Sequence, residues 1–307
     1  MRILLTGGSG FIGTALSKEL VKRGIEIVNV DIKTNNHHSD NGLLAQIQGD
    51  LLDKEVMSKA LDYEPDGIIH LAAVSRVIDA ELDKERCLLV NEELTKRLLK
   101  ACEGLPKRPW FIYGSSREVY GEQHHLPVKE GCDHSPINIY GVCKHNSERC
   151  VRDYSINHSK GMVLRFSNVY GNEYDILDRV VPRFILNAIN DRPLIINGGS
   201  QTFDFTHVDD TVKGIIKSMD HLCCRPGPYF EDLHLLTGNG TTLQRLVSII
   251  AEKLESQPQV IYGPEREYDV NRFIGDPTKA EKTIGFKAMI PIEEGVSKTI
   301  DLYQEVF

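Results

Sequence analysis

The feature that most constrains the fold lies at the start of the chain, where an apolar run is followed at once by closely spaced glycines. Residues 2–6 read RILLT, and Gly7 opens the segment GGSGFIG, which ends at Gly13. Glycine is needed where backbone must approach a pyrophosphate closely, and a helix that begins there offers free N–H groups to the phosphate charge. The pattern therefore predicts a strand, a tight turn and a helix that bind a dinucleotide through Gly7, Gly10, Phe11, Ile12 and Gly13.

A second predicted strand, residues 25–30, leads to Asp31, about 20 residues after the glycines. An acid at this position accepts hydrogen bonds from a ribose 2′-hydroxyl and repels a 2′-phosphate, which favours NAD over NADP. We expect further cofactor contacts from segments near other predicted strands: Asp50, Leu51, Leu71, Ala72 and Ala73. The alternative for Asp50 is a helix cap. His70 is expected to be a core residue with its polar atoms satisfied.

Short apolar runs alternate with helical patterns in the first half of the chain. Residues 2–6, 25–30, 67–71 and 110–113 read as buried strands, and residues 13–23 read as a helix. This alternation predicts a parallel sheet with helices on both faces, an α/β fold of the Rossmann-type doubly wound class. We expect an NAD-binding domain over 1–170, with 204–237 returning to it. A smaller mixed α/β substrate lobe should take most of 171–307, and residues 37–41 should form a polar loop.

Charge and composition exclude several classes of partner. The 307 residues carry a formal net charge of −8, from 36 Lys and Arg against 44 Asp and Glu. This balance argues against nucleic acid or an anionic membrane as a partner. No apolar run approaches the roughly 18 residues of a membrane span, and no signal peptide is visible. The seven cysteines show no metal-ligand spacing, so we expect reduced thiols, a cytoplasmic location and no metal site.

Tyr140 and Lys144 stand four residues apart at the start of a predicted helix that runs through Tyr154. This spacing places the phenol and the ammonium on one helix face, roughly 6 Å apart. A nearby cation favours the phenolate, so Tyr140 is expected to act as a base with a pKa well below its usual value of about 10. The spacing is common by chance, and only the dinucleotide motif and the preceding Ser-Ser stretch make it a catalytic prediction.

Several segments, taken in order, carry a resemblance to a known family: GGSGFIG, HLAA, SSREVYG, YGVCK, LRFSNVYG, VVPRF, DFTHVDD and finally GDPTKAEKTIGF. They resemble the extended short-chain dehydrogenase/reductases and, within these, the NAD-dependent nucleotide-sugar epimerases and dehydratases. The resemblance implies a tightly held NAD that is recycled in each turnover. It also implies a nucleotide-diphosphate sugar as substrate, a UDP-sugar first, and a homodimer.

The resemblance also implies roles for single residues. Ser116 matches the residue that hydrogen-bonds the 4-hydroxyl of the sugar, Tyr140 matches the base that takes its proton, and Lys144 matches the residue that holds the nicotinamide ribose. Asn168 and Arg266 match contacts to the diphosphate and the nucleotide. We expect Ser75, Arg117 and Arg183 as further substrate contacts. One departure is Phe203, which stands where the family usually has an arginine, so that one phosphate-binding cation is missing or replaced.

Arg117 and Glu118, within SSREVYG, bear on which reaction is expected. A 4-keto sugar has an acidified C5–H, and a dehydratase needs a carboxylate beside C5 to remove that proton. Dehydratases and related decarboxylases of the family tend to have Glu at the position of Glu118, and many dehydratases have Asp where this chain has Arg117. We therefore predict a dehydratase with Glu118 as the C5 base. The alternative functions are a UDP-sugar 4-epimerase of the UDP-glucose/galactose type, a non-catalytic NAD-binding scaffold, and an NADP-linked reductase of small ketones, which Asp31 disfavours. The alternative for Arg117 and Glu118 themselves is a pair that lies on the surface at a turn.

Overall fold

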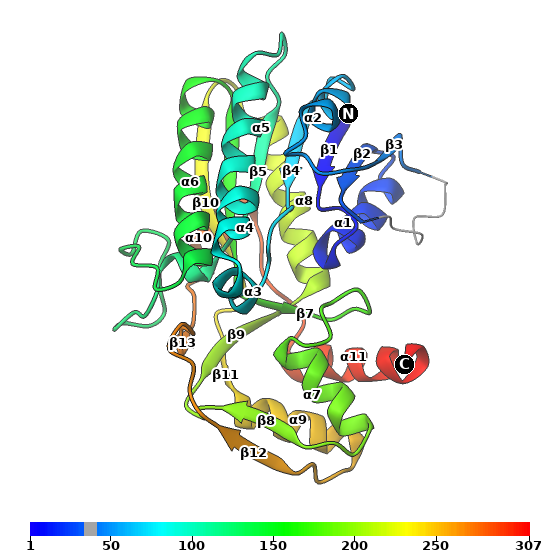
Figure 1. The fold of residues 1–307 in the computed structure, drawn as a ribbon, viewed down its shortest axis with the longest axis vertical. Coiled ribbons are helices and arrows are strands. Elements are labelled where there is room, and N and C mark those ends of the chain that lie inside the picture. Colours follow the sequence, from blue (N-terminus) through cyan, green and yellow to red (C-terminus); the bar gives the residue numbers. More distant parts are fainter. Residues whose placement is uncertain (34–41) are drawn as a thin grey trace.

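The structure is a computed structural model that describes residues 1–33 and 42–307, so the loop expected at residues 37–41 lies outside the described residues. A seven-stranded parallel sheet dominates it, with the strand order β10-β6-β5-β4-β1-β2-β3 (Figure 1). These strands are β1 (Arg2–Thr6), β2 (Glu26–Asp31), β3 (Ala45–Gln48), β4 (Gly67–His70), β5 (Trp110–Ser116), β6 (Lys160–Phe166) and β10 (Tyr229–Leu235). The order reverses at β1, so the carboxyl ends of β1 and β4 border a crevice of the kind in which such folds bind ligands.

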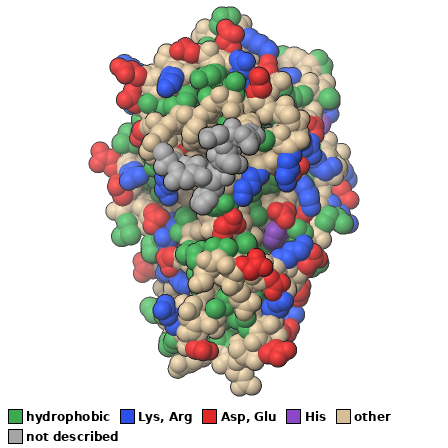
Figure 2. Space-filling model, turned by 90° about the vertical axis from the view of Figure 1, so that its right-hand side faces the viewer, with side chains coloured by type: hydrophobic (Ala, Val, Ile, Leu, Met, Phe, Trp, Pro, Cys, Tyr) green, Lys and Arg blue, Asp and Glu red, His purple; other side chains and the backbone are tan. Residues whose placement is uncertain are grey.

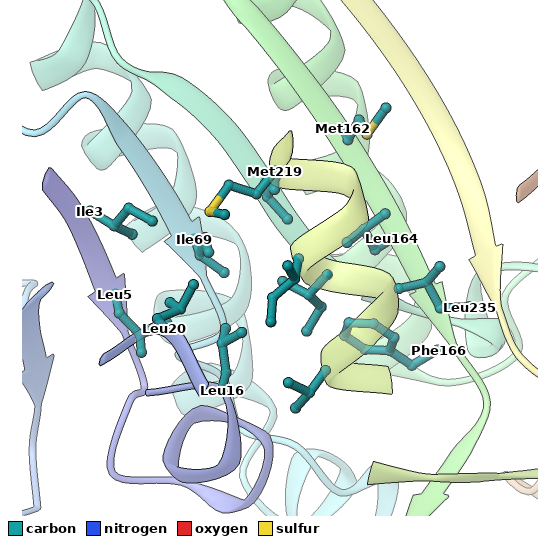
Figure 3. Packing of buried hydrophobic residues seen from close by; sticks show 14 of the residues in the cluster. Ile3, Leu5, Leu16, Leu20, Ile69, Met162, Leu164, Phe166, Met219 and Leu235 are labelled. Carbon is teal, nitrogen blue, oxygen red and sulfur yellow. The ribbon is translucent and has the colours of Figure 1, made fainter. Parts of the chain in front are cut away.

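Helices cover both faces of this sheet, because its strands are apolar on both sides. The helices α1 (Phe11–Lys22) and α8 (Val208–Cys224) pack on one face, and α2 (Lys54–Leu61), α5 (Leu94–Glu103) and α6 (Ile139–Asn157) pack on the other. Figure 3 shows Leu16 and Leu20 of α1 and Met219 of α8 packed near the strand residues Ile3 and Ile69. Full burial of one such side chain contributes about 1.5–3 kcal/mol. The predicted Rossmann-type α/β fold is confirmed.

A chain segment of short elements lies between β4 and α5 and borders the crevice. It consists of α3 (Val77–Leu82), α4 (Lys84–Leu88) and a turn of π-helix, η1 (Leu89–Glu93). After β5, a single 3-10 turn, η2 (Arg117–Val119), carries the Arg-Glu pair. These elements and α6 meet around the same end of the sheet.

The second half of the chain builds a smaller lobe below the large sheet in Figure 1. One small sheet joins β7 (Asn168–Tyr170), β9 (Thr202–His207), β11 (Gly240–Thr242) and β13 (Arg272–Phe273), and another pairs β8 (Leu194–Asn197) with β12 (Val260–Gly263). The helices α7 (Val180–Ile189), α9 (Leu243–Leu254) and α11 (Ile292–Val306) enclose its core, while α10 (Thr278–Ile284) contacts β10 and α8. Between these lobe segments the chain returns to the large sheet as α8 and β10.

The surface mixes both signs of charge. Figure 2 shows Lys and Arg interspersed with Asp and Glu over the face that it presents. Among the described residues, no helix combines the length and the apolar character that crossing a membrane requires.

Candidate active site

The glycine turn between β1 and α1 brings three stretches of backbone into contact. Gly7 has a positive φ of 71°, and a Cβ on it would lie 2.6 Å from the backbone nitrogen of Ala72. A Cβ on Gly13 would lie 2.2 Å from the carbonyl oxygen of Gly7. Gly10 precedes the first residue of α1, so the free N–H groups of that helix face the turn. The turn therefore has the close backbone approach that a pyrophosphate site requires.

Asp31, at the end of β2, lies beside this turn. Its carboxylate accepts hydrogen bonds from the backbone N–H groups of Ser9 (3.0 Å) and Lys33 (2.9 Å), which fix its position at the cavity wall. Asp50 accepts from the N–H of Leu52 at 2.9 Å, whereas the cap of α2 is Asp53, so the alternative interpretation of Asp50 as a helix cap is wrong.

His70 is satisfied within the core, as expected. It is almost fully buried, and its two ring nitrogens lie 2.6 Å and 3.1 Å from the hydroxyls of Thr6 and Thr95. Burial lowers the pKa of His70 to about 3, so the ring is neutral at physiological pH.

One cavity of about 1240 Å³ connects the glycine turn with the smaller lobe. Every residue that the sequence analysis assigned to the site lines this cavity. On the cofactor side these are Gly7, Gly10, Phe11, Ile12, Gly13, Asp31, Asp50, Leu51, Leu71, Ala72 and Ala73. At the centre and toward the smaller lobe they are Ser75, Ser116, Arg117, Glu118, Tyr140, Lys144, Asn168, Arg183 and Arg266.

Tyr140 and Lys144 lie on the face of α6 that borders β5. The ammonium of Lys144 lies 5.8 Å from the ring centre of Tyr140 and donates a hydrogen bond to the carbonyl oxygen of Gly114 at 2.7 Å. Burial raises the pKa of Tyr140 to about 12, although Arg179 and a hydrogen bond with Ser116 oppose this. Burial also lowers the pKa of Lys144 to about 8.

The expectation of a lowered Tyr140 pKa is therefore wrong, because burial raises this pKa. The spacing of the pair was predicted correctly, but the sequence does not reveal how strongly burial disfavours both charged forms. Loss of the phenolic proton at neutral pH therefore requires nearby positive charge or hydrogen bonds that offset this burial.

Arg117 and Glu118 form an ion pair inside the molecule. Arg117 Nη2 lies 2.9 Å from Glu118 Oε1, and the two residues are 9% and 5% exposed. The other oxygen of Glu118 accepts a hydrogen bond from the side-chain amide of Asn138 at 2.8 Å. The alternative of a surface pair is wrong, because the 3-10 turn after β5 directs both side chains into the cavity instead of toward solvent.

Three further residues join the site that the sequence analysis did not assign to it. Asn138 caps α6 by accepting a hydrogen bond from the N–H of Gly141 (2.8 Å) while it holds Glu118. Phe203 stacks under Arg117 with its ring centre 4.6 Å from the guanidinium carbon. Arg179 donates to the backbone and side-chain oxygens of Ser75 at 3.1 and 3.2 Å. Asn138 had a sequence signal as an N-cap residue two positions before Tyr140, and Phe203 had one as the residue at the position where the family usually has an arginine.

Arginines gather at the end of the cavity that reaches the smaller lobe. Arg183, on α7, lies 3.6 Å from Asp178, and its Nε is buried without a hydrogen-bond partner among the described residues. Arg266 lies 3.9 Å from Asp269. These guanidinium groups can bind phosphate oxygens of a ligand.

A metal is not favoured at the group of ligand-type side chains outside the cavity. His134, His145 and Glu148 offer ligand atoms within 4.8 Å of one another. Both oxygens of Glu148, however, accept hydrogen bonds from Arg165, at 2.9 and 2.7 Å. This buried guanidinium would repel a cation, so we assign no metal to the group.

Comparison with known proteins gives the class of this site. A model of the NAD dependent epimerase/dehydratase family matches residues 3–226. The chain belongs to this family. The expected enzyme class and NAD dependence are confirmed, and the alternative of a non-catalytic scaffold is set aside.

The relatives include several kinds of nucleotide-sugar enzyme. A putative UDP-glucose 4-epimerase of Methanocaldococcus jannaschii is 28% identical over 97% of each chain. A UDP-N-acetyl-alpha-D-glucosaminuronate decarboxylase of Bacillus cytotoxicus is 28% identical over 99% of this chain and 98% of its own. Among solved structures, MoeE5 in complex with UDP-glucuronic acid and NAD superposes over the whole of both chains with a TM-score of 0.91 and 29% identity.

The residues of this family member fit NAD. The glycine turn has no room for side chains where a pyrophosphate must approach, and the Asp31 carboxylate lies at the cavity wall where it can meet a ribose. Gly7, Gly10 and Gly13 would hold the pyrophosphate, and Lys144 would hold the nicotinamide ribose.

Proposed function

We propose that the protein oxidises C4 of a UDP-sugar and that Glu118 then moves the proton at C5 of the 4-keto intermediate. The observation that carries this proposal is the buried Glu118 carboxylate, which lines the same cavity as Ser116 and Tyr140 and lies close enough to Tyr140 to raise its pKa. A carboxylate in this place is a general base within reach of a carbon next to the one that reacts first.

Three residues would act at C4. Ser116 holds the 4-hydroxyl, Tyr140 accepts its proton, and Lys144 provides a positive charge that favours the phenolate. NAD, when bound, accepts a hydride from C4 and returns one later. Burial raises the pKa of Tyr140 to about 12, while Arg179 and the hydrogen bond with Ser116 act in the direction that favours the phenolate.

The arginine-rich end of the cavity supports a nucleotide diphosphate. Arg183 and Arg266 would neutralise the phosphates, Asn168 and Ser75 would add hydrogen bonds, and Arg179 would hold Ser75 in place. The relatives that act on UDP-sugars make uridine the first choice of base.

Proton removal at C5 by Glu118 fits a dehydratase when the sugar has a hydroxyl on C6. The C5 proton leaves to Glu118, a double bond forms between C5 and C6, and the C6 hydroxyl departs as water with the proton that Tyr140 took from the 4-hydroxyl. The hydride then returns to C6 and a proton returns to C5. Arg117 cannot protonate the departing hydroxyl, because a guanidinium does not lose its proton in proteins.

A 4-epimerase is the second candidate, because of the hydrogen bonds that Glu118 accepts. Arg117 holds one of its oxygens and Asn138 holds the other, as expected for a carboxylate with a positioning role. In that reaction the 4-keto sugar turns over and receives the hydride on its opposite face, and no base is needed at C5.

Turnover in heavy water tests the proposal. If Glu118 moves the C5 proton, deuterium enters C5 of the product, and Glu118→Gln still forms NADH on addition of substrate but loses 10²–10⁴-fold in product formation. Tyr140→Phe is the matched control, since it should bind NAD yet form no NADH. An inverted C4 with no deuterium on carbon would instead establish the 4-epimerase.

We further propose a homodimer that forms through exposed apolar residues at α3, α4 and α6. Leu82 is 80% exposed, Leu88 and Leu89 follow it along the chain, and Val142 lies on α6, which packs against α4. Large apolar side chains that are exposed on elements packed against each other are candidates for an interaction surface.

A further inference from the structure

The reaction proposed above leaves one buried guanidinium without a role toward the substrate. Arg117 uses its Nε to donate to Asn168 Oδ1 at 3.1 Å and its Nη2 to pair with Glu118. Its Nη1 is buried and has no hydrogen-bond partner among the described residues. Charged donors are rarely left unpaired inside a protein unless a ligand or water completes them.

Two aromatic rings fix the plane of this guanidinium. Phe203 of β9 lies 4.6 Å from its central carbon, and Phe273 of β13 lies 5.8 Å away. The two phenylalanines are register partners on neighbouring strands, so they form one apolar wall. Cation–π contact with this wall holds one face of the guanidinium, and the unpartnered Nη1 lies at its edge, where a planar ligand can meet it.

The position of Arg117 in the chain indicates which sugar atom it faces. It stands between Ser116, proposed to hold the 4-hydroxyl, and Glu118, proposed to act at C5. The N–H of Glu118 donates to Ser116 Oγ at 3.2 Å, so the turn holds these side chains close together. The substituent carried by C5, which is C6 and its oxygens, is the part of the sugar that this arrangement places beside Arg117.

We propose that Arg117 is the receptor for a carboxylate at C6, and that the substrate is therefore a UDP-uronate. This inference rests on the proposed C4 oxidation. A carboxylate matches the planar donors of a guanidinium and supplies the negative charge that a hydroxymethyl group lacks. Glu118 compensates one edge of Arg117, while Nη1 remains for the ligand.

A uronate changes the chemistry that comes after the oxidation, because there is no C6 hydroxyl to expel. The 4-keto uronate is a β-keto acid. Its C5–C6 bond can break, carbon dioxide leaves, and the electron pair passes to the C4 oxygen as an enolate. A proton supplied through Glu118 then adds to C5, and the hydride returns to C4, so the sequence is redox-neutral. If the C5–C6 bond stays intact, the same substrate leaves as its 4-epimer.

Pairs of nucleotide sugars that differ only at C6 isolate the contribution of the carboxylate to binding. We would measure the binding of UDP-glucuronic acid against UDP-glucose, and of UDP-N-acetylglucosaminuronic acid against UDP-N-acetylglucosamine, by calorimetry with the NAD-loaded protein. The members of each pair differ only at C6. We expect the uronate to bind about 10²-fold more tightly in at least one pair. NADH absorbance after mixing would report C4 oxidation separately.

Variants assign the preference to Arg117. Arg117→Gln should abolish the preference for the uronate, because uronate binding weakens about 10²-fold while hexose binding changes little. Arg117→Lys should retain part of this preference. Glu118→Gln should keep the preference. Arg245→Gln, which changes an exposed arginine on α9, is the control that should alter nothing. Retained NAD binding by each variant shows that it is folded.

Two results would overturn the inference: hexoses that bind as tightly as uronates in both pairs, or a uronate preference that survives in Arg117→Gln.

A failure of the proposed function would give a different result. Absence of NADH with every sugar would contradict C4 oxidation, whereas the binding comparison would still decide whether Arg117 receives a carboxylate.

Discussion

At the scale of single residues, burial opposes the charges that the proposed reaction requires. The pKa of Lys144 falls from 10.5 to about 8 because its ammonium is desolvated, yet this pKa still leaves it mostly protonated at pH 7. A buried charge of this kind reduces stability for the sake of function, a trade that active sites often show.

Lys144→Met should therefore stabilise the NAD-free protein at neutral pH while it abolishes turnover. The folded pKa lies below the unfolded one, so the unfolded chain binds more protons between pH 8 and 10.5. Lys144 therefore lowers the free energy of unfolding by its full amount below pH 8, and this loss disappears above pH 10.5. At pH 7 the loss is of the order of 3 kcal/mol. Urea unfolding of both proteins at about pH 7 and about pH 10 would show a gain that shrinks with pH. A less stable variant at neutral pH would contradict this account.

Asp31 should determine the choice of cofactor. Its carboxylate is fixed at the cavity wall by two backbone N–H groups, where it would repel a 2′-phosphate. We expect clear preference for NAD over NADP, and a narrower preference in Asp31→Ala, measured by cofactor titration with fluorescence detection. Equal affinity of the unchanged protein for both cofactors would be incompatible with this role.

At the scale of elements, α6 joins local helix stability to the site. Its cap, Asn138, accepts from the N–H of Gly141 and donates to Glu118, so one side chain both starts the helix that carries Tyr140 and holds the proposed C5 base. These two roles of Asn138 can be separated by measurement.

Asn138→Ala should cost about 0.5–2 kcal/mol of stability through loss of the cap. It should also slow product formation more than NADH formation, because Glu118 loses a hydrogen bond. Asp53→Ala is the matched control, since Asp53 caps α2 by accepting from Glu55 at 2.8 Å. Stopped-flow absorbance and thermal unfolding of both variants would test this. Equal slowing of both steps in Asn138→Ala would argue against a contact specific to C5 chemistry.

At the scale of the whole molecule, the cavity depends on two lobes that the chain builds by crossing between them. Asp204 of β9 accepts hydrogen bonds from Thr237 and Gly238, which come just after β10, so the small sheet is tied to the end of the large one. Of the exposed apolar residues near α4, Leu82 and Leu89 also line the cavity, whereas Leu88 does not.

Leu82→Glu should convert the proposed dimer to a monomer, because a charge at the centre of an apolar contact is costly to bury. Sedimentation velocity at micromolar concentration would measure the oligomeric state. Ile156→Glu is the control, because Ile156 is an exposed apolar residue near the other end of α6. A monomeric unchanged protein, or a dimer that survives Leu82→Glu, would remove this surface from consideration.

The sequence by itself determined the features that depend on neighbours along the chain. The strand, glycine turn and helix at residues 2–22, the acid at the end of β2 and the shared helix face of Tyr140 and Lys144 all follow from local geometry and short spacing. Even so, the predicted helix at residues 13–23 begins two residues earlier, because Gly10 starts α1.

Only the tertiary structure decided the features that depend on burial and on contacts between distant segments. The sequence does not tell whether Arg117 and Glu118 face solvent or the interior, that Phe203 and Phe273 meet beside them, or that the pKa of Tyr140 rises instead of falling. The desolvation of a charged group depends on all the atoms packed around it. The residues packed around this site come from β9, β13 and α6, which are far apart in the chain and adjacent in space.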